Sequence, residues 1–208
     1  MEVLVVTGGI GSGKSEACRI LHEAYGCGVY SADCKVKDLY SGCPGIVKEI
    51  ERSLDVVLRG DDGNFIPRLL ADVIFNDRKA LEAVEKIVFP ALVADFEAWS
   101  EGYCHDAFVV FESATILEKP YFKGFGDKVI VIDAPFETRL DRACLRDSVD
   151  RETVLARMKN QTMMNKISEG CVFPEVDAVI CNDGDIPHLE TELMQAVDRL
   201  FDIEQIIY

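Results

Sequence analysis

The sequence contains no apolar run long enough to cross a membrane, and it has little positive charge. Its 22 lysines and arginines stand against 37 aspartates and glutamates, so the formal net charge is −15. A surface this acidic repels nucleic acid phosphates and anionic lipids. No basic leader or cleavage site precedes the first apolar segment. We therefore expect a cytoplasmic protein that binds neither nucleic acid nor membranes.

Paired cysteine motifs are missing as well. The eight cysteines form no C-x-x-C pair, and the three histidines lack the spacing of metal ligands. We therefore expect reduced thiols rather than disulfides or a zinc site. No repeat or proline-rich linker divides the 208 residues, of which 49% are hydrophobic. That length and composition favour one domain with a packed core, and they do not indicate an oligomeric state.

Short apolar runs alternate with helical patterns along most of the chain. The sequence predicts strands at residues 3–6, 28–31, 108–111, 128–132 and 178–181. It predicts helices at residues 15–25, 135–146, 150–163 and 186–201. Strands that alternate with helices are typical of a parallel sheet covered on both faces. We therefore predict a three-layer α/β/α fold around a five-stranded parallel sheet.

The stretch from residue 35 to residue 100 differs, because helical spacing prevails there. One helical face is formed by Leu81, Val84, Val88, Leu92 and Phe96. Asn76 or Asp77 is expected to cap this helix, and Pro90 is expected to kink or split it. A long helical insertion in an α/β core commonly forms a lid or an acceptor pocket, although packing alone accounts for the same periodicity.

The segment Gly8–Ser15 fits the pattern G-x-x-x-x-G-K-[ST] and lies between a predicted buried strand and a predicted helix. Glycines let main-chain amides approach an anion, and the helix start adds its positive dipole. Lys14 can then reach the β- and γ-phosphates of ATP, and Ser15 can ligate Mg²⁺. We predict nucleotide contacts from Gly9, Ile10, Gly11, Ser12, Gly13, Lys14, Ser15 and Glu16. The alternative is a flexible glycine turn that contains Lys-Ser by chance.

A kinase fits this motif better than a GTPase does. The only Asn-Lys pair, Asn165-Lys166, lacks the aspartate of a guanine-binding N-K-x-D motif. Asp33 follows the strand predicted at residues 28–31, and the carboxyl end of a strand beside the phosphate loop faces the phosphates. A carboxylate there can orient an acceptor hydroxyl toward the γ-phosphate. Alternatively, Asp33 caps a helix that begins near Cys34.

The string Thr7–Ser15, T-G-G-I-G-S-G-K-S, followed by Ala32-Asp33, resembles the dephospho-CoA kinase family. Later segments that resemble this family in the same order are residues 114–118, Arg142 with Arg146 and Asp147, Arg157 with Gln161, and residues 177–184. The resemblance implies ATP-dependent phosphorylation of the 3′-hydroxyl of dephospho-CoA, the last step of coenzyme A synthesis, with Mg²⁺ as cofactor.

The resemblance also implies roles for individual residues. The catalytic residues would be Lys14, Asp33 and Arg142. Asp33 and Glu118 would contact the acceptor, and Arg146 and Asn182 the nucleotide. The implied organisation is a single domain over residues 1–208, with a core (about 1–34, 101–147 and 172–208), a helical acceptor-binding insertion (about 35–100) and a helical lid (about 148–171).

Charged residues near the predicted site also have plainer interpretations. Arg142 and Arg146 are four residues apart and share a helix face, which can equally be a solvated face with local salt bridges. Arg139 lies near that face, but spacing alone gives it no role, and we place it outside the predicted site. Glu112 ends a predicted strand and can hold Mg²⁺ through water or pair with a helix N-terminus.

Three departures from the family pattern concern the acceptor. Ser31 replaces the first aspartate of the usual D-A-D, Ile66-Pro67 replaces an Asp-Arg pair, and Phe89 replaces a histidine before Pro90. The departures at Ser31 and at Ile66-Pro67 favour the first of two alternatives that stay open. One is a kinase for another nucleoside, nucleotide or small alcohol, and the other is an ATP-binding regulatory protein that transfers no phosphate.

Overall fold

The computed structural model describes residues 1–203, apart from the side chain of Asn76. The chain divides into two compact units. The core unit is formed by Met1–Ser31 together with the chain from Tyr103 onward, and the helical unit is formed by Ala32–Gly102.

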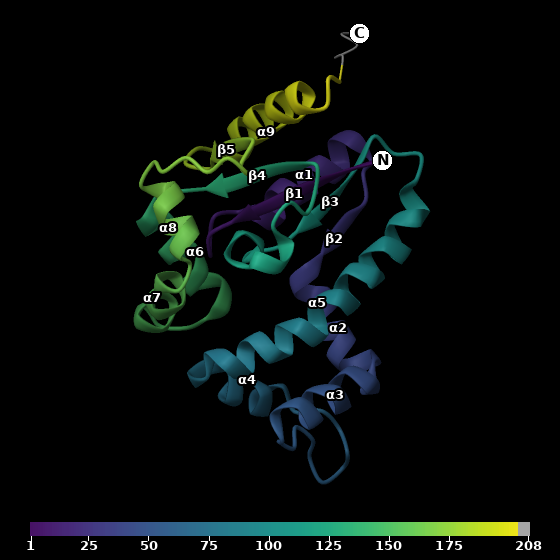
Figure 1. The fold of residues 1–208 in the computed structure, drawn as a ribbon. Coiled ribbons are helices and arrows are strands. Elements are labelled where there is room, and N and C mark those ends of the chain that lie inside the picture. The colour runs from purple at the N-terminus through teal and green to yellow at the C-terminus, as the bar shows by residue number, and fades with distance from the viewer. Residues whose placement is uncertain (204–208) are drawn as a thin grey trace. The chain divides into compact units, whose positions relative to one another are not determined.

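The core unit is built on a parallel sheet of five strands in the order β2-β3-β1-β4-β5, which can be followed in Figure 1. The strands are β1 Glu2–Gly8, β2 Val29–Ser31, β3 Phe108–Glu112, β4 Lys128–Asp133 and β5 Ala178–Cys181. The central strand β1 pairs with β3 and β4, which aligns Val6 with Glu112 and Gly8 with Ile132. The predicted α/β fold with a five-stranded parallel sheet is confirmed.

Apolar side chains cover both faces of this sheet. On one face, Leu4 and Val6 of β1 pack with α1 (Lys14–Tyr25) and α9 (Ile186–Leu200). On the other face, Val131 of β4 packs with α8 (Thr162–Ser168). Strands buried on both faces are apolar along their whole length, which explains the continuous apolar runs in the sequence. Between β4 and α8 the chain forms α6 (Phe136–Asp147) and α7 (Arg151–Lys159).

The helical unit has its own apolar core. Its helices are α2 (Ala32–Gly42), α3 (Pro44–Leu54), α4 (Pro67–Asn76) and α5 (Arg78–Ser100). Val47 and Ile50 of α3 are buried against Val84 and Val88 of α5. Asp77 caps α5, because its Oδ1 accepts hydrogen bonds from the main-chain nitrogens of Lys79 and Ala80 at 2.8 and 3.2 Å.

The structure refines two expectations for α5. The helix continues through Pro90, so of the expected kink or split the split does not occur. Proline removes the hydrogen bond to the carbonyl of Lys86, and both residues are exposed, so water can solvate that carbonyl. Leu81 is only half-buried, and Ala80 is buried in its place. The buried stripe therefore begins one residue earlier than the pattern predicts.

The single helix predicted at residues 150–163 is two helices, α7 and α8. Between them, Gln161 leaves the helical conformation with φ −90° and ψ 70°. Its side chain makes two hydrogen bonds to other parts of the core unit. Tertiary hydrogen bonds therefore interrupt a segment whose local sequence favours one helix.

Neither disulfides nor membrane spans contribute to the described part of the chain. All eight cysteines lie within it and carry free thiols. Burial raises the pKa of Cys27 to about 11 and that of Cys18 further, so these two thiols are poor nucleophiles. Among residues 1–203, no helix combines the length and apolar character needed to cross a bilayer.

We predict that Leu193→Ala lowers the free energy of unfolding by about 2–5 kcal/mol, because the substitution leaves a cavity in the core. Leu193 of α9 is 0% exposed and packs against the sheet. The matched control is Leu145→Ala on α6, where the side chain is 85% exposed. Urea unfolding followed by circular dichroism measures both variants. Equal losses for the two would contradict this account of the core.

Candidate active site

Residues 8–13 connect the end of β1 to the start of α1 and form the phosphate loop. Gly11 and Gly13 adopt φ angles of 75° and 99°, which residues with side chains rarely adopt. Nζ of Lys14 donates hydrogen bonds to the carbonyl oxygens of Gly8 and Gly9, at 3.0 and 3.3 Å. The first-turn amides of α1 have no carbonyl partner within the helix. Loop, lysine and helix start are therefore arranged to bind an anion.

Two buried hydroxyl groups support this interpretation. Oγ1 of Thr7 and Oγ of Ser12 have no hydrogen-bond partner among the residues that the structure describes. A buried polar group without a partner costs free energy. Ser12 belongs to the loop itself, so a phosphate oxygen bound there can accept its hydrogen bond. The residues present thus fit a polyphosphate ligand.

Two buried amide side chains hold the loop from other elements. Oε1 of Gln161 accepts a hydrogen bond from the Ile10 nitrogen at 2.8 Å, and its Nε2 donates to the Ala114 carbonyl at 3.5 Å. Nδ2 of Asn182, which follows β5, donates to the Ser12 carbonyl at 2.9 Å. The N–H group of Ile10 therefore binds Gln161, and the predicted nucleotide contact of Ile10 cannot use that group unless the bond breaks.

We predict that Gln161→Leu lowers the free energy of unfolding by about 1–3 kcal/mol, because the Ile10 amide then loses its partner. Gln161 is 6% exposed, so water cannot readily replace the lost hydrogen bond. The matched control is Gln195→Leu, at an exposed position of α9. Denaturant unfolding measures both, and a Gln161→Leu protein as stable as the control would contradict this support of the loop.

The predicted arginines fall into two places. Nη1 of Arg142 donates to the Asn182 carbonyl at 3.3 Å, so Arg142 is linked to the loop through Asn182. Arg146 is exposed and pairs with Asp147 at 2.7 Å, and Arg157 of α7 reaches the same carboxylate at 2.7 Å. The hydrogen bonds from Arg146 and then Arg157 lower the pKa of Asp147. Arg146 and Arg157 therefore form a cluster around Asp147.

Oxygen donors gather at the ends of β2 and β3. Ser15, Ser31 and Glu112 line one cavity of about 400 Å³. Oγ of Ser31 donates to Oε2 of Glu112 at 2.6 Å. Hard oxygen donors suit Mg²⁺, which usually keeps several waters and binds one or two carboxylates together with substrate phosphates. The oxygen donors of Ser15, Ser31 and Glu112 fit Mg²⁺ that is shared with a phosphate and water. Within residues 1–203, no group of three or more His, Cys, Asp or Glu is arranged to hold a metal.

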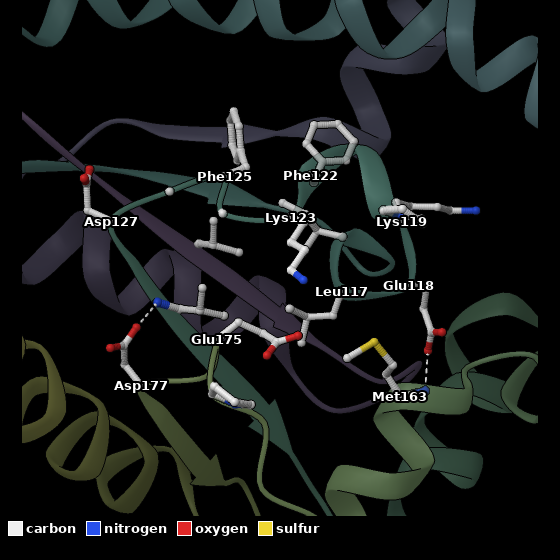
Figure 2. Close-up of a pocket in the computed structure, with 17 residues that line it drawn as sticks. Leu117, Glu118, Lys119, Phe122, Lys123, Phe125, Asp127, Met163, Glu175 and Asp177 are labelled. Carbon is white, nitrogen blue, oxygen red and sulfur yellow. Dashed lines mark hydrogen bonds between the residues drawn. The ribbon is translucent and has the colours of Figure 1, made fainter.

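Glu118 occupies an unexpected position. Its carboxylate accepts hydrogen bonds from Oγ1 of Thr162 at 2.9 Å and from the Met163 nitrogen at 2.7 Å, at the start of α8. Figure 2 shows Glu118 beside a cavity of about 530 Å³, into which Lys123 and Glu175 point. The residues lining that cavity are separate from the phosphate loop. Glu118 therefore fixes the start of α8, a contact that the sequence does not reveal.

Two further predicted residues lie at helix starts. Asp33 is exposed in the first turn of α2, two residues after β2 ends. The helix begins at Ala32 rather than near Cys34, so Asp33 lies inside the first turn and not before it. Glu16 lies in the first turn of α1, where Arg19 bonds its carboxylate at 2.6 Å. That hydrogen bond from Arg19 lowers the pKa of Glu16.

Residues 2–188 match the family model described as dephospho-CoA kinase. The chain belongs to the dephospho-CoA kinase family. The dephospho-CoA kinase of Bacteroides fragilis is 33% identical over 204 residues, which cover 94% of this chain and 91% of that protein. The dephospho-CoA kinase of Aquifex aeolicus is 26% identical over 200 residues, which cover 96% of this chain and 98% of that protein. The predicted family and class of enzyme are confirmed.

Solved structures agree with the fold. The protein TT1252 from Thermus thermophilus superposes with a TM-score of 0.79 at 26% identity, covering 98% of both chains. Dephospho-CoA kinase from Campylobacter jejuni superposes with a TM-score of 0.55 at 22% identity, covering 96% of this chain and 97% of that one. The second likeness shows the fold alone.

The structure adds two residues to the neighbourhood of the phosphate loop. Sequence patterns assign Gln161 only to a lid helix and give Arg139 no role. In the structure, Gln161 bonds the loop, and Arg139 is buried against it. The signal for Arg139 is its spacing, because it lies four residues before the buried Ala143 and next to the buried Leu140. A charged residue at a core-facing helix position is unusual.

Proposed function

We propose that this member of the dephospho-CoA kinase family transfers the γ-phosphoryl group of ATP to the 3′-hydroxyl of dephospho-CoA, giving coenzyme A and ADP. The observation that carries the proposal is the phosphate loop, whose Ser12 hydroxyl is buried without a protein partner among the described residues. Membership in the family supplies the acceptor.

The nucleotide would be held by the loop and by α1. Lys14 would exchange the carbonyl oxygens of Gly8 and Gly9 for β- and γ-phosphate oxygens, which make stronger, charge-assisted hydrogen bonds. Arg142 would neutralise charge on the γ-phosphoryl group, and Arg146 and Asn182 would contact the rest of the nucleotide. Ser15, and Glu112 through water, would hold Mg²⁺, which would supply further neutralisation of the phosphates.

The acceptor side of the proposal rests on two carboxylates. Asp33 would accept a hydrogen bond from the 3′-hydroxyl, orient that oxygen toward the γ-phosphate, and take its proton as the new P–O bond forms. Glu118 would contact the acceptor from its position beside α8. Residues of the helical unit would hold the remainder of dephospho-CoA. Segment 148–171 would act as a lid, and its closure would exclude water and limit ATP hydrolysis.

Composition supports the cellular setting that we propose. A net charge of −15 disfavours nucleic acid and anionic membranes as partners. Free thiols at all eight cysteines accord with a reducing cytoplasm. The proposed partner is therefore the small-molecule substrate dephospho-CoA, with neither nucleic acid nor a membrane.

A coupled assay for ADP release tests the function directly. We expect turnover with dephospho-CoA and none with its 3′-deoxy analogue, which lacks the accepting hydroxyl. Mass spectrometry should identify the product as coenzyme A. Turnover only with another nucleoside or alcohol would assign the enzyme a different acceptor. ATP binding without transfer to dephospho-CoA or to any other nucleoside or alcohol tested would favour a regulatory protein.

A further inference from the structure

Arg139 is a buried cation behind the phosphate loop. It lies in the first turn of α6 and is 2% exposed. Among the described residues, it is the largest side chain that is fully buried. Burying a charged group is costly unless other groups compensate it. An arginine buried for packing alone would therefore lower the stability of the fold compared with an apolar residue.

The phosphate loop is shaped against this residue. A Cβ atom added at Gly9 would overlap Nη1 of Arg139, and one added at Gly11 would overlap its carbonyl oxygen. The overlap at Gly11 involves main chain, which cannot rotate away as the end of a side chain can. Arg139 therefore supports the loop at two points, once with its backbone and once with its guanidinium group.

The charge of Arg139 is only partly compensated. Its Nη1 lies 3.6 Å from Oδ1 of Asp133, at the end of β4, which is beyond a normal hydrogen bond. That same Asp133 oxygen accepts a hydrogen bond from Oγ of Ser168 at 3.0 Å. Nε of Arg139 is buried and has no hydrogen-bond partner within residues 1–203. A substantial share of the positive charge is thus left to act on the neighbouring loop.

We propose that Arg139 is a positioning residue for the polyphosphate site, a fixed positive charge that sets the shape of the loop and raises its affinity for nucleotide phosphates. Arg139 acts through the backbone of Gly9 and Gly11. The inference rests on the proposed function, because it assumes that the loop binds ATP. A local cation matters here since the chain as a whole carries a net charge of −15 and repels anions.

The effect should grow with the number of phosphates. We expect Arg139→Met, which keeps an unbranched apolar stem and removes the guanidinium group with its charge, to weaken ATP binding about 30-fold, ADP binding less and AMP binding least. Arg139→Lys should recover most of the ATP affinity because it restores the charge. Isothermal titration calorimetry on the full chain, repeated at two salt concentrations, measures these dissociation constants. The difference between wild type and Arg139→Met should shrink as salt rises.

Kinetics provide an independent reading. In Arg139→Met, the KM for ATP should rise while the KM for dephospho-CoA stays within about twofold of wild type. The matched control is Arg199→Met, at an exposed position of α9, which should leave both constants unchanged. Asp133→Asn tests the opposite change, because it removes a negative charge beside Arg139 instead of the positive charge. Removing the counter-charge should leave ATP binding unchanged or strengthen it about threefold.

Several results would overturn the proposal. They are equal weakening of ATP, ADP and AMP in Arg139→Met, failure of Arg139→Lys to recover affinity, and unchanged ATP binding in a folded Arg139→Met. Should Arg139→Met not fold, Arg139→Lys and Asp133→Asn still decide: weaker ATP binding in both, with melting temperatures near wild type, would refute the charge effect. Wild-type protein that fails to bind ATP would instead refute the proposed function.

Discussion

Lys14→Met is expected to lower kcat for coenzyme A formation by about 10³-fold, because a preorganised cation aimed at a developing negative charge contributes about that much. Nζ of Lys14 already lies over the loop, within 3.0 Å of the Gly8 carbonyl and 3.3 Å of the Gly9 carbonyl. Little reorganisation is therefore needed when a phosphate oxygen replaces those carbonyls. The coupled ADP assay with saturating dephospho-CoA measures the loss.

Two further measurements make this prediction specific. Arg199→Met, which removes an exposed cation away from the loop, should leave kcat within about twofold of wild type. The melting temperature of Lys14→Met should stay close to that of wild type, since Lys14 is not part of the buried core. A Lys14→Met protein that retains a tenth or more of the wild-type kcat would contradict the assignment of Lys14 to the transferred phosphoryl group.

Asp33→Asn should lower kcat by about 10²–10⁴-fold, the usual range for a general base, while ATP binding survives. Asparagine keeps the size of the side chain and can still accept a hydrogen bond, but it cannot take the proton of the 3′-hydroxyl. The dissociation constant for ATP should change little, because the proposed role concerns the acceptor. Calorimetry for ATP and steady-state kinetics for dephospho-CoA separate these two expectations.

Asp38→Asn is the control for Asp33→Asn. Asp38 is another exposed aspartate on α2, five residues further along the same helix. It should tolerate the change with kcat within about twofold of wild type. If both variants lose activity equally, the loss reflects the overall negative charge of α2 and not a general-base role of Asp33. If neither loses activity, Asp33 is not the group that orients the acceptor.

The sheet could be predicted because its strands are buried on both faces. Apolar runs at β1, β3 and β4 leave little choice between strand and loop, and their bounds agree within about two residues with those predicted. The phosphate loop could be predicted because glycines, lysine and serine at fixed spacing make one recognisable anion site. In both cases the cause is local, so the local sequence contains it.

What could not be predicted depends on contacts between distant segments. The break between α7 and α8 occurs because Gln161 bonds Ile10, which lies 151 residues earlier. Glu118 fixes the start of α8 by accepting a hydrogen bond from the Met163 nitrogen, which lies 45 residues later in the chain. Arg139 has the helical spacing of a core residue but carries a charge, and sequence patterns place charged residues on a solvated helix face. Only the fold reveals that this arginine has Gly9 and Gly11 as neighbours.

The two hydrogen bonds of Gln161 also have a consequence for storage of the protein. Its oxygen accepts from Ile10 and its nitrogen donates to Ala114, so the position requires an acceptor and a donor at once. Deamidation would convert this side chain into a carboxylate, which has no N–H to donate and would place negative charge against the Ala114 carbonyl. Deamidation at this single amide would therefore keep the hydrogen bond from Ile10, lose the one to Ala114, and weaken the anchoring of Gln161 beside the phosphate loop.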